Sequence, residues 1–170
     1  MKSPFATSPD LGKGLIAGVV GGLAASFMME QFQALWSKVS DEIHPRKKPG
    51  RRADPATVKM AQTVSKAVTG EKIPAARKPL AGEAVHYAMG AASGAIYGVA
   101  TELAPFAAAG DGLAFGTSVW LAADNGIVPA LGLARPAKEI PFSTHFYALA
   151  SHLVYGFVAE TVRQALRRAL

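Results

Sequence analysis

Ionisable and polar side chains lie inside the apolar stretches of this 170-residue sequence. An imidazole titrates near neutral pH and a carboxylate binds or relays cations, so such residues could carry protons or ions through an apolar layer. The same side chains could instead join neighbouring helices by hydrogen bonds. The residues concerned are Glu30, His86, Tyr97, Glu102, Asp124, His145, His152 and Glu160.

A metal or haem site is an alternative use of these residues. Candidate ligands for a divalent metal are Glu30, His86, His145 and His152, and His86 with His152 could hold a b-type haem. The sequence has no cysteine, which excludes thiolate metal sites and iron–sulfur clusters. No serine or aspartate lies in a recognisable nucleophile motif, so an enzyme is less favoured than a non-enzymatic protein. The first expectation is therefore no cofactor, with haem b or a divalent metal as the alternative.

Four windows are long and apolar enough to cross a bilayer, which takes about 20 mostly apolar residues. They are about 15–36, 83–104, 113–134 and 144–166. Half of the residues are hydrophobic, and the windows nearly lack the polar faces that a soluble bundle needs. The sequence predicts a single all-α membrane domain over 1–170, a polytopic helix bundle with three to four spans. The first window is too long for the apolar region of a cleaved signal peptide.

The third window contains two features that interrupt helices. The sequence ADNG lies near its middle, and Pro129 would remove the hydrogen bond to the carbonyl of Asn125. A kinked helix would satisfy this pattern, as would a helix followed by a re-entrant segment. We expect a broken span.

Basic charge is concentrated in the loop 38–82, which holds 11 of the 18 lysines and arginines. Such a loop beside an apolar span is typical of the cytoplasmic side, near anionic lipid headgroups. The positive-inside rule places this loop and loop 135–143 in the cytoplasm and both termini outside. The sequence lacks the face of basic and aromatic residues that nucleic-acid-binding proteins present, so nucleic acid is not an expected partner.

Within this loop, residues 54–70 predict a short amphipathic helix. Asp54 can cap it, Pro55 suits its first position and Gly70 suits its end. The helix would lie flat on the cytoplasmic headgroups or pack against the end of the bundle.

Glycine recurs every fourth residue in two of the windows. Such ridges allow close helix contact, which predicts a homo-oligomer or a partner in a membrane complex. The ridges are Gly14, Gly18 and Gly22 in the first window and Gly90, Gly94 and Gly98 in the second. Gly18, Gly22 and Glu30 have the same spacing as Gly90, Gly94 and Glu102, and as Gly112, Gly116 and Asp124, which indicates either chance or a duplicated helix.

Three stretches of the second half carry a family resemblance: HYAMGAASGAIYGVATELAP, GLAFGTSVWLAADNGIVPALGLARP and SHLVYGFVAETVRQALRR. The positions that matter are His86, Glu102, Pro129, Gly132, Leu133, Pro136, His152 and Glu160. With GLIAGVVGG in the first window, this pattern resembles the YagU-type bacterial inner-membrane proteins, a family of uncharacterised function. The resemblance covers about residues 83–168. The basic central loop departs from it, as does Asp124, where a His-containing segment is expected.

The resemblance implies a multi-pass protein of the bacterial inner membrane and supplies no reaction. The residues predict a non-enzymatic role in proton or ion homeostasis, carried by a polar stripe inside the membrane. The alternative is a haem- or metal-binding redox protein, or an accessory subunit of a larger membrane complex.

Overall fold

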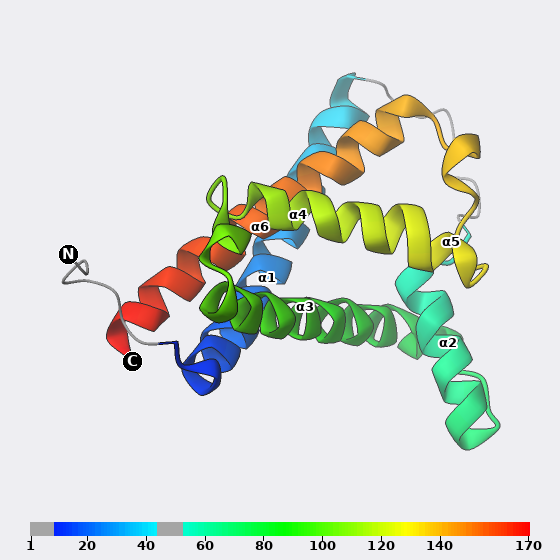
Figure 1. Cartoon of the computed structure of the whole chain (residues 1–170). Coiled ribbons are helices and arrows are strands. Elements are labelled where there is room, and N and C mark those ends of the chain that lie inside the picture. Colours follow the sequence, from blue (N-terminus) through cyan, green and yellow to red (C-terminus); the bar gives the residue numbers. More distant parts are fainter. Residues whose placement is uncertain (1–8, 44–52) are drawn as a thin grey trace, which may run out of the picture.

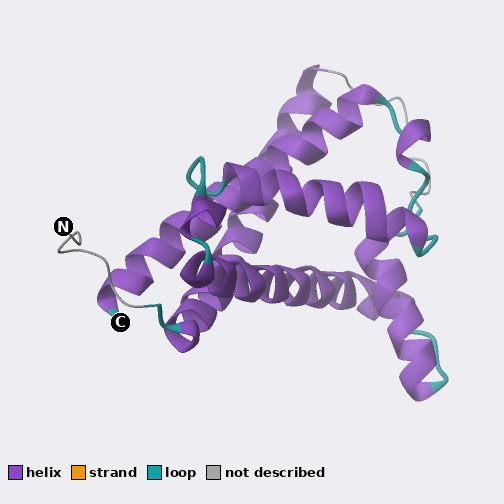
Figure 2. Ribbon diagram, viewed as in Figure 1, coloured by secondary structure: helices purple, strands orange, loops and turns teal. Residues whose placement is uncertain are grey.

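The computed structural model describes residues 9–43 and 53–170, and every regular element among them is a helix (Figures 1 and 2). The longer helices are α1 (Leu11–Ile43), α2 (Ala56–Thr69), α3 (Lys78–Leu103) and α6 (Phe142–Ala169). The shorter elements are η1 (Ala75–Arg77), η2 (Pro105–Ala108), α4 (Leu113–Val119), η3 (Trp120–Ile127), α5 (Val128–Ala130) and η4 (Ala137–Glu139). The predicted all-α class is confirmed.

Helix α1 is the centre of the arrangement, because α3 and α6 both pack against it and α4 packs on α6 (Figure 1). The start of α1 lies beside the ends of α3 and α6. There the backbone N–H of Asp10 donates to Glu102, and Lys13 Nζ donates to the oxygen of Leu170 at 2.6 Å. The three helices are therefore tied together at one end of the bundle.

The two glycine ridges face one another across the α1–α3 contact. A Cβ added at Gly14, Gly18 or Gly22 would collide with the carbonyl oxygen of Gly98, Gly94 or Gly90, respectively. The helices thus touch backbone to backbone, as small residues permit. The prediction of close helix contact is confirmed. Because each ridge is occupied by the other within one chain, the ridges are not free to form the oligomer that we predicted through them.

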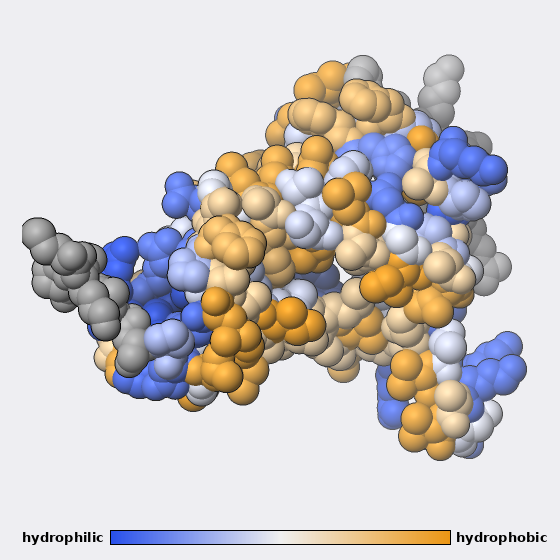
Figure 3. Space-filling model, in the orientation of Figure 1, coloured by the Kyte–Doolittle hydropathy of each residue, from blue (hydrophilic) through white to orange (hydrophobic). Residues whose placement is uncertain are grey.

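Burial in the bundle is inverted relative to a water-soluble protein. Buried positions hold small residues such as Ala17 and Ala25, together with polar ones such as Ser151 and Glu160. Large apolar side chains point outward, for example Ile16, Phe27, Ile96, Leu121, Phe146 and Phe157. Figure 3 shows hydrophilic residues gathered toward two ends of the molecule, around the start of α1 and around α2 and η4, with apolar residues between them.

All four predicted windows fall on helical segments, but they differ in how well they meet the requirements for a span. In the described part of the chain, α1 is the one helix that is both long and apolar enough to cross a membrane. It also continues to Ile43, so the first residues of the predicted loop 38–82 are helical. Residues 44–52, which carry much of the loop's basic charge, lie outside the described residues.

The predicted short helix is present as α2, but its start differs from the prediction. Pro55 occupies the cap position and Asp54 makes no capping bond; its carboxylate instead pairs with Lys78 Nζ at 2.5 Å. The expected end is confirmed, because Gly70 adopts a left-handed conformation with φ of 77°. Helix α2 packs on the start of α3, where Val58 lies against Gly82, and Lys59 Nζ donates to the carbonyl of Leu133 at 2.8 Å.

The third window is not broken, contrary to our expectation. Residues 113–130 form one helical run in which α4 passes into the π-helical turns of η3 and then into α5. The wider turns accommodate the ADNG sequence, and Asn125 Nδ2 donates to the carbonyl of Trp120 at 3.1 Å. Pro129 lies where the wide turns of η3 pass into α5, and the run ends soon afterwards, before Gly132, whose φ is 69°.

Candidate functional site

A buried acid, Glu160, is the most completely bonded group in the molecule's polar interior. Its side chain is 1 % exposed, and it accepts two hydrogen bonds from Arg163, at 2.7 and 2.8 Å. Gln164 Nε2 and the hydroxyl of Tyr97 also donate to it, each at 2.8 Å. Glu160, Arg163 and Gln164 share one face of α6, whereas Tyr97 comes from α3. The cluster therefore joins two helices through a fully satisfied carboxylate.

A second acid–arginine pair lies closer to the end of the bundle. Glu102 accepts from Arg167 Nε at 2.6 Å and from Nη2 at 3.2 Å, and from the backbone N–H of Asp10 at 2.9 Å. This hydrogen bond raises the pKa of the Arg167 guanidinium, because it favours the charged form. The pair joins α3 to α6 beside the start of α1.

The middle of the bundle holds two hydroxyl groups between α3 and α6. Ser93 Oγ lies 2.9 Å from the hydroxyl of Tyr155, which donates to the carbonyl of Gly90 at 2.8 Å. Tyr97, one turn further along α3, stacks on Phe115 of α4 with ring centroids 4.0 Å apart. Both tyrosines are buried, so a line of hydroxyls continues from Glu160 into the interior.

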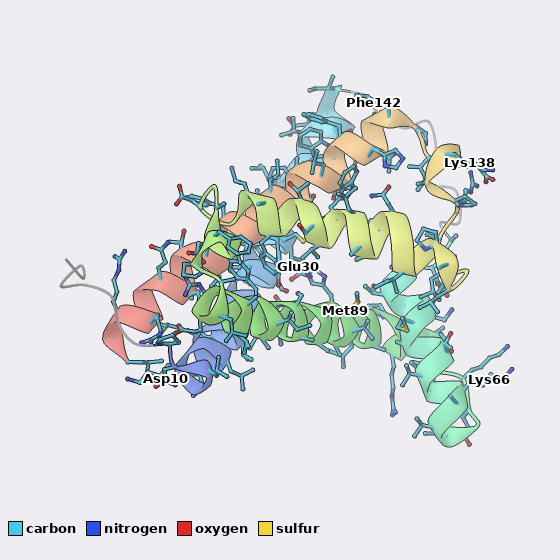
Figure 4. All side chains as sticks on the ribbon, viewed as in Figure 1. Asp10, Glu30, Lys66, Met89, Lys138 and Phe142 are labelled. Carbon is cyan, nitrogen blue, oxygen red and sulfur yellow. The ribbon has the colours of Figure 1, made fainter. Side chains whose placement is uncertain are left out.

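The line reaches a third acid near the start of α3. Glu30 on α1 accepts a hydrogen bond from the hydroxyl of Tyr87 at 3.0 Å, and His86 Nε2 lies 3.4 Å from the carbonyl of Ser26. In Figure 4, Glu30 lies behind the space between α3 and α4, where the space-filling view in Figure 3 shows a hollow. Both Glu30 and His86 are partly exposed.

A carboxylate–imidazole pair joins η3 to α6. His152 Nδ1 donates to the carbonyl of Ala148 at 2.9 Å, and the same nitrogen lies 3.8 Å from Asp124 Oδ2. His152 is buried, whereas 39 % of the Asp124 side chain is exposed. The pair thus has one member inside the bundle and one that solvent can reach.

Comparison with known proteins gives a family and nothing closer. The model of a family described as "Protein of unknown function (DUF1440)" matches residues 37–161. The chain belongs to the DUF1440 family. No curated protein and no solved structure matches it. The specific likeness to YagU-type proteins remains a prediction.

The DUF1440 match contains most of the candidate groups but not their partners at the bundle's end. Glu102, Asp124, His152 and Glu160 lie inside it. The N-terminal glycine ridge, Glu30 and the arginines of α6 lie outside it. The matched region therefore supplies Glu102 and Glu160, and the segment that follows it supplies the arginines that bond to these two acids.

The four candidate metal ligands do not lie together in the structure. In the described parts of this DUF1440 chain, no three histidines or acids lie close enough together to hold a metal ion. The four candidates point elsewhere: Glu30 to Tyr87, His86 to Ser26, His145 to the carbonyl of Ala137 at 2.8 Å, and His152 to Ala148 and Asp124. These four residues come from helices that the sequence alone could not identify as neighbours, and the divalent-metal alternative stays a prediction. The haem alternative stays a prediction.

Sequence reasoning found the acids and missed several of their partners. Arg163 is three residues after Glu160, a separation that brings the two side chains together on a helix. Arg167, Gln164 and Tyr87 were missed. The signal for Gln164 was present, because Glu160 and Gln164 are four residues apart and so lie on one face of a helix.

Proposed function

We propose that this DUF1440 protein is a multi-pass membrane protein and that its polar interior moves protons or small cations. The single observation that carries the proposal is the inverted burial: charged and hydroxyl side chains lie inside the bundle, and large apolar side chains lie on its outside. Exposed apolar surface of this extent is typical of a protein whose solvent is lipid.

Polar side chains along α3 support the proposed path of protons or small cations through the bundle. Along α3, Ser93 and Tyr97 are four residues apart, which is about one turn, or roughly 5–6 Å on one face of the helix. Tyr87 precedes Ser93 by six residues and Glu102 follows Tyr97 by five, so water must bridge these two longer intervals. Hydroxyls and carboxylates at such intervals can pass a proton with the help of interior water.

The two ends of this line differ, which supports a pathway open on one side. At the end formed by α1, α3 and α6, the pairs Glu160–Arg163 and Glu102–Arg167 bond all of their charged groups to one another. At the other end, Glu30 is partly exposed and accepts a hydrogen bond from the hydroxyl of Tyr87. In the proposed mechanism a proton enters at Glu30, and the paired acids close the far end.

The proposed setting is the bacterial inner membrane, with four crossings by α1, α3, the run 113–130 and α6. Helix α2 and the basic loop would lie in the cytoplasm against anionic headgroups. Exposed Val64 and Val68 on α2, beside Lys66, suit a headgroup contact. Four crossings place the start of α1 and the end of α6 on the same side, here the outer one. This agrees with their position beside each other in the bundle. A partner or a second copy would dock on surfaces other than the glycine ridges.

The test is proton flux in liposomes that contain the purified full chain and a pH-sensitive dye. A potassium gradient with valinomycin supplies the driving force. We expect flux with the natural sequence and at least a tenfold lower rate with Glu30→Gln, since the entry carboxylate is lost. Glu71→Gln is the matched control, because Glu71 is exposed beyond α2.

Two results would overturn the proposal. One is an absence of flux in liposomes whose protein is folded and correctly inserted. The other is equal flux for Glu30→Gln and the natural chain. An absorption spectrum of the same preparation covers the redox alternative: a Soret band that disappears with His86→Leu or His152→Leu would favour the haem protein.

A further inference from the structure

Two pairs of segments in this chain repeat one another. Residues 14–25 read GLIAGVVGGLAA and residues 112–123 read GLAFGTSVWLAA, with six of the twelve positions identical. Residues 92–102 read ASGAIYGVATE and residues 150–160 read ASHLVYGFVAE, with five of the eleven positions identical. The first pair lies in α1 and in α4–η3, and the second lies in α3 and α6. The repeated unit is thus a pair of helices.

The contacts within each pair repeat in the same register. In the first unit, a Cβ at Gly14 would meet the carbonyl oxygen of Gly98, and one at Gly18 would meet that of Gly94. In the second unit, the equivalent additions at Gly112 and Gly116 would meet the carbonyl oxygens of Gly156 and His152, respectively. Sequence and packing agree on one equivalence, which makes Gly94 equivalent to His152.

This register replaces the one that the spacing of the acids predicted. Glu102 is equivalent to Glu160, since both follow the same Tyr-Gly motif. Asp124 is equivalent to Ser26, not to Glu30 or Glu102. Each unit therefore keeps its acid near the closed end of the bundle, while Asp124 has no acidic counterpart.

The two units differ where their helices cross. In the first unit the crossing is closed by glycine backbone and by Ser26, which lies against Gly90 and whose buried hydroxyl has no hydrogen-bond partner, while Gly94 lies against Gly18 and Gly22. In the second unit the same two positions are His152 and Asp124, which lie 3.8 Å apart across the crossing. Asp124 lies within the widened turns of η3, and π-helical turns are frequent at functional sites.

We propose that the chain is a tandem duplication of one helix-pair unit and that the second unit carries a proton-binding site, Asp124 with His152, at the crossing that the first unit closes with serine and glycine. The assignment deepens the proposed function, on which it rests for the use made of the proton. The ligand is a proton because the crossing offers one imidazole and one carboxylate, which is too few groups for a metal.

The chemistry of binding follows from the hydrogen bonds. His152 Nδ1 carries the hydrogen that is donated to the carbonyl of Ala148, so Nε2 holds the free electron pair of the neutral ring. A proton that arrives from solvent bonds to Nε2 and leaves Nδ1–H in place. The positive charge of the imidazolium is then balanced by Asp124. The titratable groups that face Asp124 are His152 and His145, both on α6.

The proposal is tested by the NMR signals of nitrogen-15-labelled histidine in the full chain, held in lipid nanodiscs and titrated with acid. His152 is assigned from the signal lost in His152→Gln. We expect His152 to bind a proton about tenfold more weakly in Asp124→Asn, because the nearby negative charge is gone. Asp111→Asn is the matched control: Asp111 is exposed at a φ of 53°, which asparagine tolerates, and its removal leaves His152 unchanged.

A second variant returns the site to the residue of the first unit. Asp124→Ser is expected to fold and to weaken proton binding at His152 as much as Asp124→Asn does. The proposal is overturned if His152 does not titrate, or if its midpoint is the same in all three variants. The two proposals fail separately: titration without liposome flux removes the proposed function and keeps the site, whereas flux without titration of His152 removes the site.

Discussion

The first helix pair and the second are built on one plan but packed to different degrees. Helices α1 and α3 touch backbone to backbone along three glycines on each side. The second pair has two such glycine contacts with α6, at Gly112 and Gly116, after which η3 widens and carries Asp124. Where two helices touch backbone to backbone, no polar side chain fits between them. The polar pair Asp124 and His152 occurs where this close packing stops.

The two units also differ in how closely the first helix of each approaches the second helix of the other unit. Ala17 of α1 is fully buried, and a Cβ at Gly21 would meet the carbonyl of Ala159 on α6, so α1 and α6 approach closely. The equivalent residues of α4 are Phe115 and Val119. Phe115 inserts its ring against Tyr97 of α3 and holds α4 away from that helix. One large side chain thus separates the arrangement of the second unit from that of the first.

The largest effect is expected from filling the tight contact of the first pair. Gly94→Leu places a side chain against the backbone of Gly18, which cannot yield, and should cost at least about 3 kcal/mol of unfolding free energy. Ala92→Leu, on the exposed side of α3, should change it by less than about 0.5 kcal/mol. Thermal unfolding followed by circular dichroism in mild detergent measures both, and equal stabilities would contradict the backbone contact.

A smaller effect should separate the two equivalent acids. Glu160→Gln leaves the buried charge of Arg163 without its counterion and should cost about 3 kcal/mol. Glu102→Gln should cost less, about 2 kcal/mol, because the Glu102 side chain is slightly more exposed and Arg167 lies near the end of the bundle. Denaturant titrations of the two variants side by side give the difference. A larger loss for Glu102→Gln would reverse the proposed order of burial.

The smallest effect concerns the residue that separates α3 from α4. Phe115→Ala gives α4 the residue of α1 and should bring α4 closer to α3, at a cost of about 1 kcal/mol for the lost aromatic pair. Spin labels on cysteines at Ala92 and Ala122 report the separation, and the absence of native cysteine makes the labelling specific. Phe157→Ala, which removes a half-exposed ring from α6, is the control and should leave the distance unchanged.

Local patterns in the sequence predicted local structure well. Apolar length located the four helical windows, and fourfold glycine spacing identified two contact surfaces. The pairing of Glu160 with Arg163 is likewise local, because the two are three residues apart. Each of these depends on groups that lie within a few turns of one another, where helix geometry fixes the distance.

The partners of those surfaces were not predictable in the same way. Arg167 and Glu102 are 65 residues apart, and nothing in helix periodicity says that they meet. The start of α2 was misplaced because Asp54 prefers the ammonium of Lys78, a partner from another helix, to the capping position. The duplication was sought in single helices on the spacing of acids, whereas the repeated unit is a pair of helices.

The glycine contacts have a consequence for how this chain can vary. At Gly18 and Gly94 the native residue is already the smallest there is, so every substitution adds atoms and none can improve the fit. A substitution at either position therefore persists only if a second substitution on the facing helix compensates for it. At the crossing of Asp124 and His152, by contrast, the present side chains could be replaced by smaller or by larger ones. It is the part of the bundle in which new chemistry can arise by single substitutions.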